Sequence, residues 1–309
     1  RHEVVDYFQY GVRPRPRELW RGVRQCDVVV GWFASWHTAA ALRLARLARK
    51  PSLLIFGGFD TAAMPEIGYG SQRGGVRRRL VRSTAALATR LVTNSHYSLG
   101  EIERNVGIDP RRVAVVHHGI PDRFGDEVLA GERGRMALTV GVVYETNLAR
   151  KGHGPFAEAA RLLDDVEFVL AGKWLDETGR RVAAQAPPNL RLTDWLPDEE
   201  LDELFRTASV YVQASLHEGF GLSLAEAMLA GAVPVTTSAG ALPEVVGEVG
   251  VRIPESTPEA IAAGVREALE AGPEERRAAR ERVREHFPYE RRRDGLLAEL
   301  ERALARERS

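Results

Sequence analysis

Two glutamates eight residues apart, Glu218 and Glu226, belong to the stretch that most constrains the fold of this chain. Between them lies the run Gly219-Phe220-Gly221-Leu222-Ser223. Glycines this close together allow the backbone to approach a ligand before the chain enters a helix. The short, β-prone run from Val210 to Gln213 precedes them and predicts a buried strand.

The residues after the glycines complete a recognisable order of elements. Leu224 to Leu229 has helical composition and stops before Gly231, and Ala232 to Thr237 predicts a second strand. A strand, glycine loop, helix and strand in this order place free N–H groups and a helix dipole at the carboxyl edge of a parallel sheet, which suits a diphosphate. Glu226 is expected in the first helical turn, where it would accept hydrogen bonds from ribose hydroxyls.

The paired glutamates, with GFGLSLAEAMLAGAVPV around them and GALPEVVG after them, resemble the signature of the family 4 retaining glycosyltransferases. The resemblance covers nearly the whole chain. It implies the GT-B fold, an α/β architecture of two Rossmann-like, doubly wound parallel-sheet domains that face a central cleft. The alternative is an ordinary βαβ unit, in which the helix dipole alone favours glutamates near a helix start.

Length and pattern agree with two domains. A chain of 309 residues predicts two, and strands alternate with helices in both halves, as in a parallel sheet covered on both faces. Composition changes between residues 124 and 135, where the run GDEVLAGERGR has little to bury, so we expect the linker there. We therefore predict an N-terminal acceptor-side domain over 1–130 and a nucleotide-sugar-binding domain over 135–288. The resemblance implies that the helix at 289–309 returns to the first domain, and a solvated helix is the alternative.

The resemblance assigns the donor site to the second half. Only three of the 43 basic residues are lysines, and two of these, Lys151 and Lys173, follow predicted strands there. A compact ammonium suits a phosphate, although chance placement is the alternative. Arg-Lys-Gly at 150–152 matches the family's diphosphate-binding lysine, and Arg150 is expected to replace an arginine that is absent after Gly141. The implied donor-binding residues are Arg150, Lys151, Gly172, Lys173, Leu196, Gly219, Phe220, Gly221, Leu222 and Glu226.

Catalytic candidates come from both halves. The resemblance implies that Glu218 lies near the transferred sugar. Family members often have a histidine at the end of the strand that here is followed by Gly57-Gly58-Phe59-Asp60. Asp60 is a candidate in its place because packing poorly explains a carboxylate at a sheet's carboxyl edge. His37, in the preceding loop, is a second candidate, although a lone histidine is more often structural. His118 stands in the segment that resembles the end of the family's first domain, and a structural role is expected for it.

The start of the chain departs from the family. Members open with a strand and a glycine-rich loop, whereas this sequence begins with Arg1 to Phe8, a predicted strand, and has no such loop before the strand Cys26 to Trp32. We therefore expect either a fragment or a first sheet that lacks a strand. Catalytic competence of the chain stays open on this ground.

The mechanism expected from the site needs no metal. There is no Asp-x-Asp cluster and no Cys/His ligand spacing, so we expect no metal and no cofactor besides the nucleoside-diphosphate sugar as donor substrate. Lys151, the amides of 219–221 and the helix dipole near Leu222 would stabilise the leaving diphosphate. The family implies front-face transfer with retention of configuration.

Charge suggests a partner for the first half. Residues 1–130 hold 20 Lys and Arg against 12 Asp and Glu, while 131–309 hold 23 against 31. Much of the excess comes from Arg73, Arg77, Arg78, Arg79 and Arg82. On one side of a helix these would favour an anionic membrane and a lipid-linked acceptor, and a solvated face is the alternative. Nucleic acid is disfavoured because aromatic residues are not interleaved with the arginines.

Compartment and function class complete the expectations. A single cysteine, Cys26, suggests a reducing compartment, and neither a secretory signal nor an apolar run of 18 residues is visible. We expect a cytoplasmic protein, peripheral at the inner face of the membrane if it meets lipid. Two other functions stay open, namely a catalytically silent nucleotide-sugar-binding protein and another GT-B enzyme, such as an epimerase or an inverting transferase. Donor base, sugar and acceptor, whether glycan, lipid-linked or small molecule, are left open.

Overall fold

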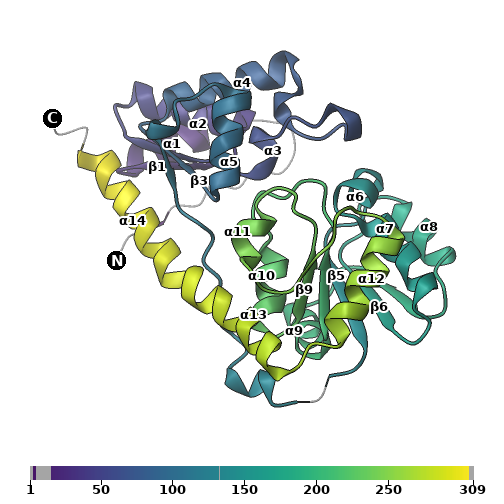
Figure 1. The fold of residues 1–309 in the computed structure, drawn as a ribbon. Coiled ribbons are helices and arrows are strands. Elements are labelled where there is room, and N and C mark those ends of the chain that lie inside the picture. The colour runs from purple at the N-terminus through teal and green to yellow at the C-terminus, as the bar shows by residue number, and fades with distance from the viewer. Residues whose placement is uncertain (1–2, 5–14, 132, 306–309) are drawn as a thin grey trace. The chain divides into compact units, whose positions relative to one another are not determined.

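The computed structural model describes residues 3–4, 15–131 and 133–305. The chain forms two compact units (Figure 1), each with its own parallel sheet. Unit 1 comprises Arg1–His117 together with Arg292–Ser309, and unit 2 comprises His118–Arg291. The strand predicted for residues 1–8 lies outside the described residues, apart from Glu3 and Val4.

The division falls at His117, before the predicted boundary at residue 130. The two boundaries differ because the segment expected to be a bare linker carries two buried apolar side chains, Phe124 and Val128, which pack in the core of unit 2. Arg133 also anchors this segment, donating hydrogen bonds to main-chain carbonyls, among them that of Ala208. The linker expected at residues 124–135 is therefore part of the second unit.

Unit 1 is built on four parallel strands in the order β1-β2-β3-β4 among its described residues. The strands are β1 (Val29–Trp32), β2 (Ser52–Ile55), β3 (Arg90–Thr93) and β4 (Val113–Val115). The helices are α1 (Pro16–Gln25), α2 (Trp36–Leu47), α3 (Gly58–Thr61), α4 (Gly75–Leu87), α5 (His96–Glu101), the π-helical turn η3 (Ile102–Val106) and the 3-10 turns η1 (Pro65–Ile67), η2 (Ser71–Arg73) and η4 (Pro110–Arg112). The segment 62–75 contains two short 3-10 turns.

Both faces of the unit 1 sheet are covered. Leu42 of α2 and Val81 of α4 pack against Leu54 on one face. On the other face, Leu296 and Leu300 pack against β2 and β3. These two leucines belong to α14 (Tyr289–Ala305), whose residues from Arg292 onward are part of unit 1.

Unit 2 has six parallel strands in the order β10-β9-β8-β5-β6-β7 among its described residues. Its strands are β5 (Met136–Val140), β6 (Glu167–Ala171), β7 (Leu190–Thr193), β8 (Val210–Gln213), β9 (Val233–Thr236) and β10 (Val251–Arg252). Its helices are η5 (Asp126–Leu129), α6 (Glu145–Arg150), α7 (His153–Ala159), η6 (Ala160–Leu162), α8 (Thr178–Ala184), α9 (Asp198–Thr207), α10 (Leu222–Leu229), α11 (Leu242–Val246), α12 (Pro258–Leu269) and α13 (Pro273–His286).

The strand order of unit 2 reverses between β5 and β8. The chain runs outward from β5 to β7, returns to β8 and runs outward again to β10. In doubly wound sheets, ligands bind at the carboxyl ends of the strands beside such a reversal. The residues that follow β5, β6 and β8 are therefore the place to look for a site.

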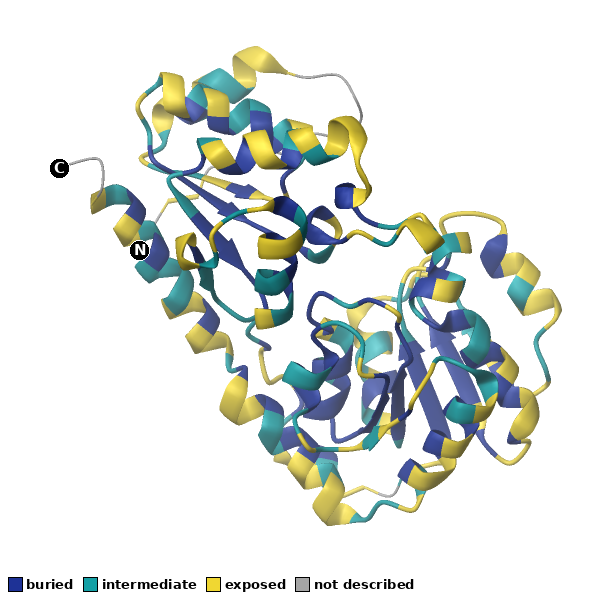
Figure 2. Ribbon diagram, turned by 45° about the horizontal axis from the view of Figure 1, so that its top comes forward, coloured by how far each residue is buried: buried dark blue, intermediate teal, exposed yellow. Residues whose placement is uncertain are grey.

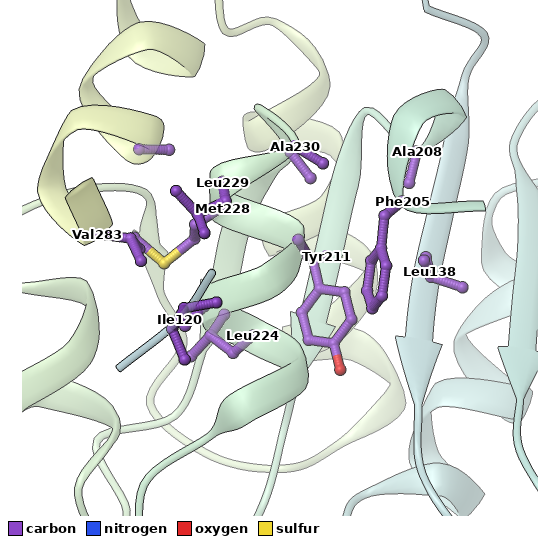
Figure 3. Packing of buried hydrophobic residues seen from close by; sticks show 14 of the residues in the cluster. Ile120, Leu138, Phe205, Ala208, Tyr211, Leu224, Met228, Leu229, Ala230 and Val283 are labelled. Atoms are coloured by element: carbon purple, nitrogen blue, oxygen red, sulfur yellow. The ribbon is translucent and has the colours of Figure 1, made fainter. Parts of the chain in front are cut away.

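Helices cover both faces of this sheet, and its buried residues are dark blue in Figure 2. One cluster places Tyr211 of β8 against Phe205 of α9 and Leu138 of β5 (Figure 3). The hydroxyl of Tyr211 points toward the carboxyl ends of the strands and lies 3.2 Å from the main-chain nitrogen of Val140. This packing fixes the last residue of β5 relative to β8, which is the pair of strands where the order reverses.

Most predicted elements of unit 2 are confirmed, with two differences. Strand β8 and helix α10 coincide with the predicted segments, but α10 begins at Leu222, so Glu226 lies in its second turn and not in its first. The second difference is α6, which lies in the run 144–152, where no helix was predicted. Helix formers such as Leu148 and Ala149 and an acidic Glu145 in the first turn favour a helix there.

Candidate functional site

Two glycine turns meet at the carboxyl ends of β5 and β6. Gly172 has a φ of 152°, and a Cβ on it would lie 2.2 Å from the carbonyl oxygen of Gly141. A Cβ on Gly141 would in turn lie 3.1 Å from the Nε2 atom of His153. Any side chain at Gly172 would thus collide with the neighbouring turn, so these two half-buried glycines let the two turns lie in close contact.

A third tight turn brings Lys151 to the end of β8. Lys151 follows α6, and Gly152 adopts a φ of 73°, with space for a Cβ blocked by the carbonyl oxygen of Ala214 at 2.3 Å. The carbonyl of Arg150 accepts a hydrogen bond of 2.8 Å from the N–H of Leu216. The Arg-Lys-Gly motif is therefore attached directly to the strand that leads into the glutamate loop.

Lys151 and Glu218 form an ion pair at the centre of this region. The Nζ of Lys151 lies 2.6 Å from the Oε2 of Glu218, and the two side chains are only 18% and 13% exposed. Burial raises the pKa of Glu218, but the charges of Lys151 and Arg150 outweigh it and hold that pKa below its usual range. The amide of Gln213 lies 3.5 Å from the same carboxylate oxygen and donates to Ser215 at 2.7 Å. Glu218 is thus ionised, oriented and still partly open to solvent.

Arg150 has a different place from the one expected. Its side chain is buried, and its guanidinium donates to Oδ1 of Asn147 at 3.0 and 2.7 Å. Asn147 donates in turn to the carbonyl of Val142 at 2.6 Å. Through these hydrogen bonds, Arg150 stabilises the segment that carries Lys151. Arg150 is therefore not a second exposed cation for the donor, as had been expected.

The glycine loop between the glutamates is rigidly held. Gly221 has a φ of 104° and precedes α10 directly. The carbonyl of Glu218 accepts a hydrogen bond of 2.9 Å from Ala241, and a Cβ on Gly240 would lie 2.2 Å from the same oxygen. Phe220 is buried, with its ring 5.1 Å from that of His118, so its side chain packs in the core while the loop's backbone borders the sheet edge. His118 is half-buried against this ring, and its structural role stays a prediction.

Glu226 is paired with an arginine that sequence reasoning missed. Its Oε1 accepts a hydrogen bond of 3.0 Å from Arg123. Burial raises the pKa of Glu226, and Arg123 opposes that shift. The two residues are 103 positions apart, and the sequence offers no local signal for such a pairing.

The remaining donor candidates lie after β6 and β7. Lys173 is exposed, and its carbonyl accepts a hydrogen bond of 2.9 Å from Val143. Asp194 accepts from the N–H groups of Trp174 and Trp195 at 2.9 and 2.7 Å, which ties the two turns together and lowers its pKa. Leu196 packs on the core of unit 2. Within the described residues, no hydrogen bond or ion pair links Lys173 or Leu196 to the Lys151–Glu218 pair.

Asp60 of unit 1 is buried and bonded to the neighbouring turn, and its catalytic role stays a prediction. Only 3% of the residue is exposed, and its Oδ2 accepts a hydrogen bond of 2.9 Å from the N–H of Ala34 in the turn after β1. Burial raises its pKa to about 7, although the hydrogen bond to Ala34 opposes the shift. Its Oδ1 is buried without a hydrogen-bond partner among the described residues. The carboxyl group therefore supports the end of β1 from below the surface.

His37, the other unit 1 candidate, lies in the first turn of α2. Its ring is 3.5 Å from that of Trp36, centroid to centroid, and it is half-buried. No hydrogen bond in the described part of the chain joins His37 to Asp60. Among the described residues, no group of three or more His, Cys, Asp and Glu is placed to hold a metal ion, and no helix is long and apolar enough to cross a membrane.

Two parallel-sheet α/β units, one with glycine turns and paired charges at its carboxyl edge, define a GT-B fold. Solved structures agree: HepE from Anabaena, in complex with UDP and glucose, has a TM-score of 0.78 at 16% identity over 93% of this chain and 81% of its own. Sucrose-phosphate synthase from Thermosynechococcus elongatus has a TM-score of 0.72 at 16% identity, covering 95% of this chain and 80% of its own.

Family models then identify the family. The model described as glycosyl transferases group 1 matches residues 134–271, and the model for glycosyltransferase family 4 matches residues 4–124. The chain belongs to glycosyltransferase family 4, of the glycosyl transferases group 1.

Curated relatives match parts of the chain. It is 31% identical over 167 residues to the MMP alpha-(1->4)-mannosyltransferase of Mycolicibacterium hassiacum, which covers 52% of this chain and 39% of the relative. It is 27% identical over 318 residues to the D-inositol 3-phosphate glycosyltransferase of Mycolicibacterium vanbaalenii, covering 91% of this chain and 66% of the relative. The chain spans between 21% and 54% of the length of the first four curated relatives that it matches.

Proposed function

We propose that this chain transfers a sugar from a nucleoside-diphosphate sugar to an acceptor, with retention of the anomeric configuration. The observation that carries the proposal is the half-buried Lys151–Glu218 ion pair, set among glycine turns at the carboxyl edge of the unit 2 sheet. A cation and a carboxylate held in contact there suit a ligand that has a phosphate group next to a hydroxylated sugar. Family membership and the named glycosyltransferase relatives support the same reaction.

The chain's own residues suggest how charge is handled. When a donor diphosphate binds, Lys151 would exchange part of its contact with Glu218 for a phosphate oxygen, because both acceptors compete for one ammonium. Glu218 would then accept hydrogen bonds from hydroxyls of the sugar. As the bond to the sugar breaks, the diphosphate gains negative charge, which Lys151 and the N–H groups at the start of α10 are suited to stabilise.

The donor class has independent support. Structures of HepE, which is similar in fold, are complexes with UDP and with UDP-glucose. Both ends of such a ligand have a counterpart here, since Lys151 and Glu218 suit the diphosphate and sugar and Glu226 suits the ribose. We propose a nucleoside-diphosphate sugar donor and leave the base open among uridine, guanosine and adenosine.

We further propose a glycan or lipid-linked acceptor, met at an anionic membrane surface by the basic helices of unit 1. Arg79 and Arg82 are exposed on α4, and α4 contains no acidic residue. The five arginines do not all share one exposed side of α4, because Arg73 lies in η2 before the helix and Arg78 is half-buried, whereas Arg77 is exposed. Val76 beside them is 79% exposed and would add an apolar contact.

The test is a titration of the purified chain with UDP-, GDP- and ADP-sugars, following both heat of binding and release of nucleoside diphosphate. We expect one donor to bind, with affinity reduced in Glu226→Ala and Lys151→Ala, and slow nucleotide release that accelerates with acceptor. Nuclear magnetic resonance of the product should show the donor's anomeric configuration.

Other outcomes support the other functions. Donor binding without release, even when lipid-linked and oligosaccharide acceptors are supplied, would indicate a catalytically silent binding protein. An inverted product would indicate an inverting transferase, and a free epimerised sugar an epimerase. If no donor binds, the proposal is wrong.

A further inference from the structure

One guanidinium in unit 2 bridges two carboxylates on neighbouring helices. The Nε of Arg123 lies 2.7 and 2.9 Å from the two carboxylate oxygens of Asp202 on α9. Its Nη1 lies 3.0 Å from Oε1 of Glu226 on α10. Arg123 therefore couples the glutamate assigned to the nucleotide to the adjacent helix.

Aromatic rings hold this arginine in place. Its Cζ lies 4.8 Å from the ring centroid of Phe124, which is buried, and 6.0 Å from that of Phe205. The side chains of Arg123, Asp202 and Glu226 are 33%, 22% and 26% exposed. Charges that are partly buried and held in one geometry interact more strongly than mobile surface ion pairs.

Arg123 also counters the shift in the pKa of Glu226. Burial raises the pKa of Glu226, and the carboxylates of Asp202 and Asp198 on α9 raise it further. Arg123 opposes all three through its charge and its hydrogen bond. Without Arg123, Glu226 would face the carboxylates of Asp202 and Asp198. Among the charged groups of the described residues that act on Glu226, no other cation would compensate for them.

The pairing leaves half of the glutamate available. Only Oε1 is engaged, and Oε2 accepts no hydrogen bond from the described residues. We propose that Arg123 is a positioning residue, which holds Glu226 oriented so that its second oxygen accepts hydrogen bonds from the ribose hydroxyls of the donor. This inference rests on the proposed function, since it assumes that a nucleotide binds beside α10.

Ribose recognition can be measured separately from diphosphate binding. The intact chain is titrated calorimetrically with UDP, GDP and ADP, and the nucleotide that binds is compared with its 2′-deoxy and 3′-deoxy forms. We expect the parent chain to prefer the ribonucleotide. Arg123→Gln should weaken ribonucleotide binding about tenfold, because Glu226 is no longer oriented and one charge-assisted hydrogen bond between its carboxylate and a ribose hydroxyl is lost. Binding of the deoxy forms should change little, because they lack that hydroxyl. Arg123→Lys, which keeps the cation, should recover part of the preference.

A neighbouring arginine provides the matched control. The Cζ of Arg206 lies 5.2 Å from the same Phe124 ring, and its guanidinium donates to the carbonyls of Phe124 and Arg123 at 3.2 and 3.4 Å. Among the described residues, it forms no ion pair with a carboxylate. Arg206→Gln should therefore keep the ribose preference. In a Glu226→Gln background, Arg123→Gln should cause no further loss, because Arg123 acts through Glu226.

The outcomes separate this inference from the proposed function. If the parent chain binds none of the three nucleotides, both fail. If it binds a ribonucleotide preferentially and Arg123→Gln either keeps that preference or weakens ribo and deoxy forms equally, the positioning role is overturned and the proposed function stands. If Arg123→Gln does not fold, Arg123→Lys carries the test: a preference equal to that of the parent would overturn the role.

Discussion

The Nζ of Lys151 and the Oε2 of Glu218 lie 2.6 Å apart, although 67 residues separate them in the chain. The contact exists because a glycine turn attaches Lys151 to the end of β8, the same strand that leads into the loop of Glu218. The ammonium of Lys151 helps to hold the pKa of the partly buried Glu218 below its usual range. The pair therefore responds as a unit when either member is changed.

Lys151→Ala should reduce donor affinity and change its pH dependence. Loss of the cation should weaken binding of the nucleoside-diphosphate sugar at least about tenfold. Burial raises the pKa of Glu218, and Lys151 is the main group that offsets this effect in the parent chain. Without Lys151, the pKa of Glu218 should therefore rise. The acid limb of the binding profile should consequently move to higher pH. Titrations between about pH 4 and 8 check this, because the ordinary pKa of a glutamate lies at the lower end of that range.

Lys50→Ala is the control for that prediction, because Lys50 lies in unit 1 near the end of α2. It should leave both the affinity and the pH profile unchanged. A Lys151→Ala chain with weaker binding but an unmoved acid limb would show that the two charges are not coupled.

Asp60→Asn should change stability in a pH-dependent way. The pKa of Asp60 is about 7 in the folded chain and near 3.8 when exposed, so the folded state binds the extra proton between these values. Stability of the parent therefore falls as pH rises from about 4 to 7, since the buried carboxyl must ionise. The asparagine side chain does not ionise, so the variant should not lose stability in this way. Above pH 7, its free energy of unfolding should exceed that of the parent by about 2 to 4 kcal/mol more than it does at low pH.

Denaturant unfolding of both chains at about pH 5 and about pH 8 measures that difference. Asparagine keeps an oxygen for the N–H of Ala34, so the two chains should be close in stability at the lower pH. Equal differences at both pH values would contradict the raised pKa.

Gly152→Ala should destabilise unit 2 by at least about 2 kcal/mol, because the residue has a φ of 73° and its Cβ would lie 2.3 Å from the carbonyl oxygen of Ala214. Donor affinity should fall as well, since the turn places Lys151. Gly134→Ala, at a position with open space around the Cβ, is the matched control and should be nearly neutral. Thermal unfolding followed by circular dichroism compares the two, and equal melting temperatures would refute the strain at Gly152.

Local patterns predicted the β8-α10-β9 unit well. A β-prone run, two glycines and a helical run are neighbours in the sequence, so strand, turn and helix follow from adjacent residues. The Arg123–Glu226 pair and the Asp60–Ala34 hydrogen bond span 103 and 26 residues, and depend on how helices and turns pack. No helix was predicted over the segment 144–152, although its helix-forming residues favour the helix α6 found there.

Charge reversal on α4 should separate lipid binding from donor binding. Arg79→Glu with Arg82→Glu removes two exposed cations and adds two anions beside the exposed Val76. Each cation near an anionic surface contributes about 1 kcal/mol, so the double change should weaken sedimentation with phosphatidylglycerol vesicles more than about tenfold. Arg266→Glu with Arg277→Glu, two exposed positions on α12 and α13 of unit 2, is the charge-matched control. It should keep vesicle binding, and both variants should keep the donor affinity of the parent. Equal loss in both variants would point to net charge instead of an α4 surface, and no binding of the parent to these vesicles would refute the membrane contact.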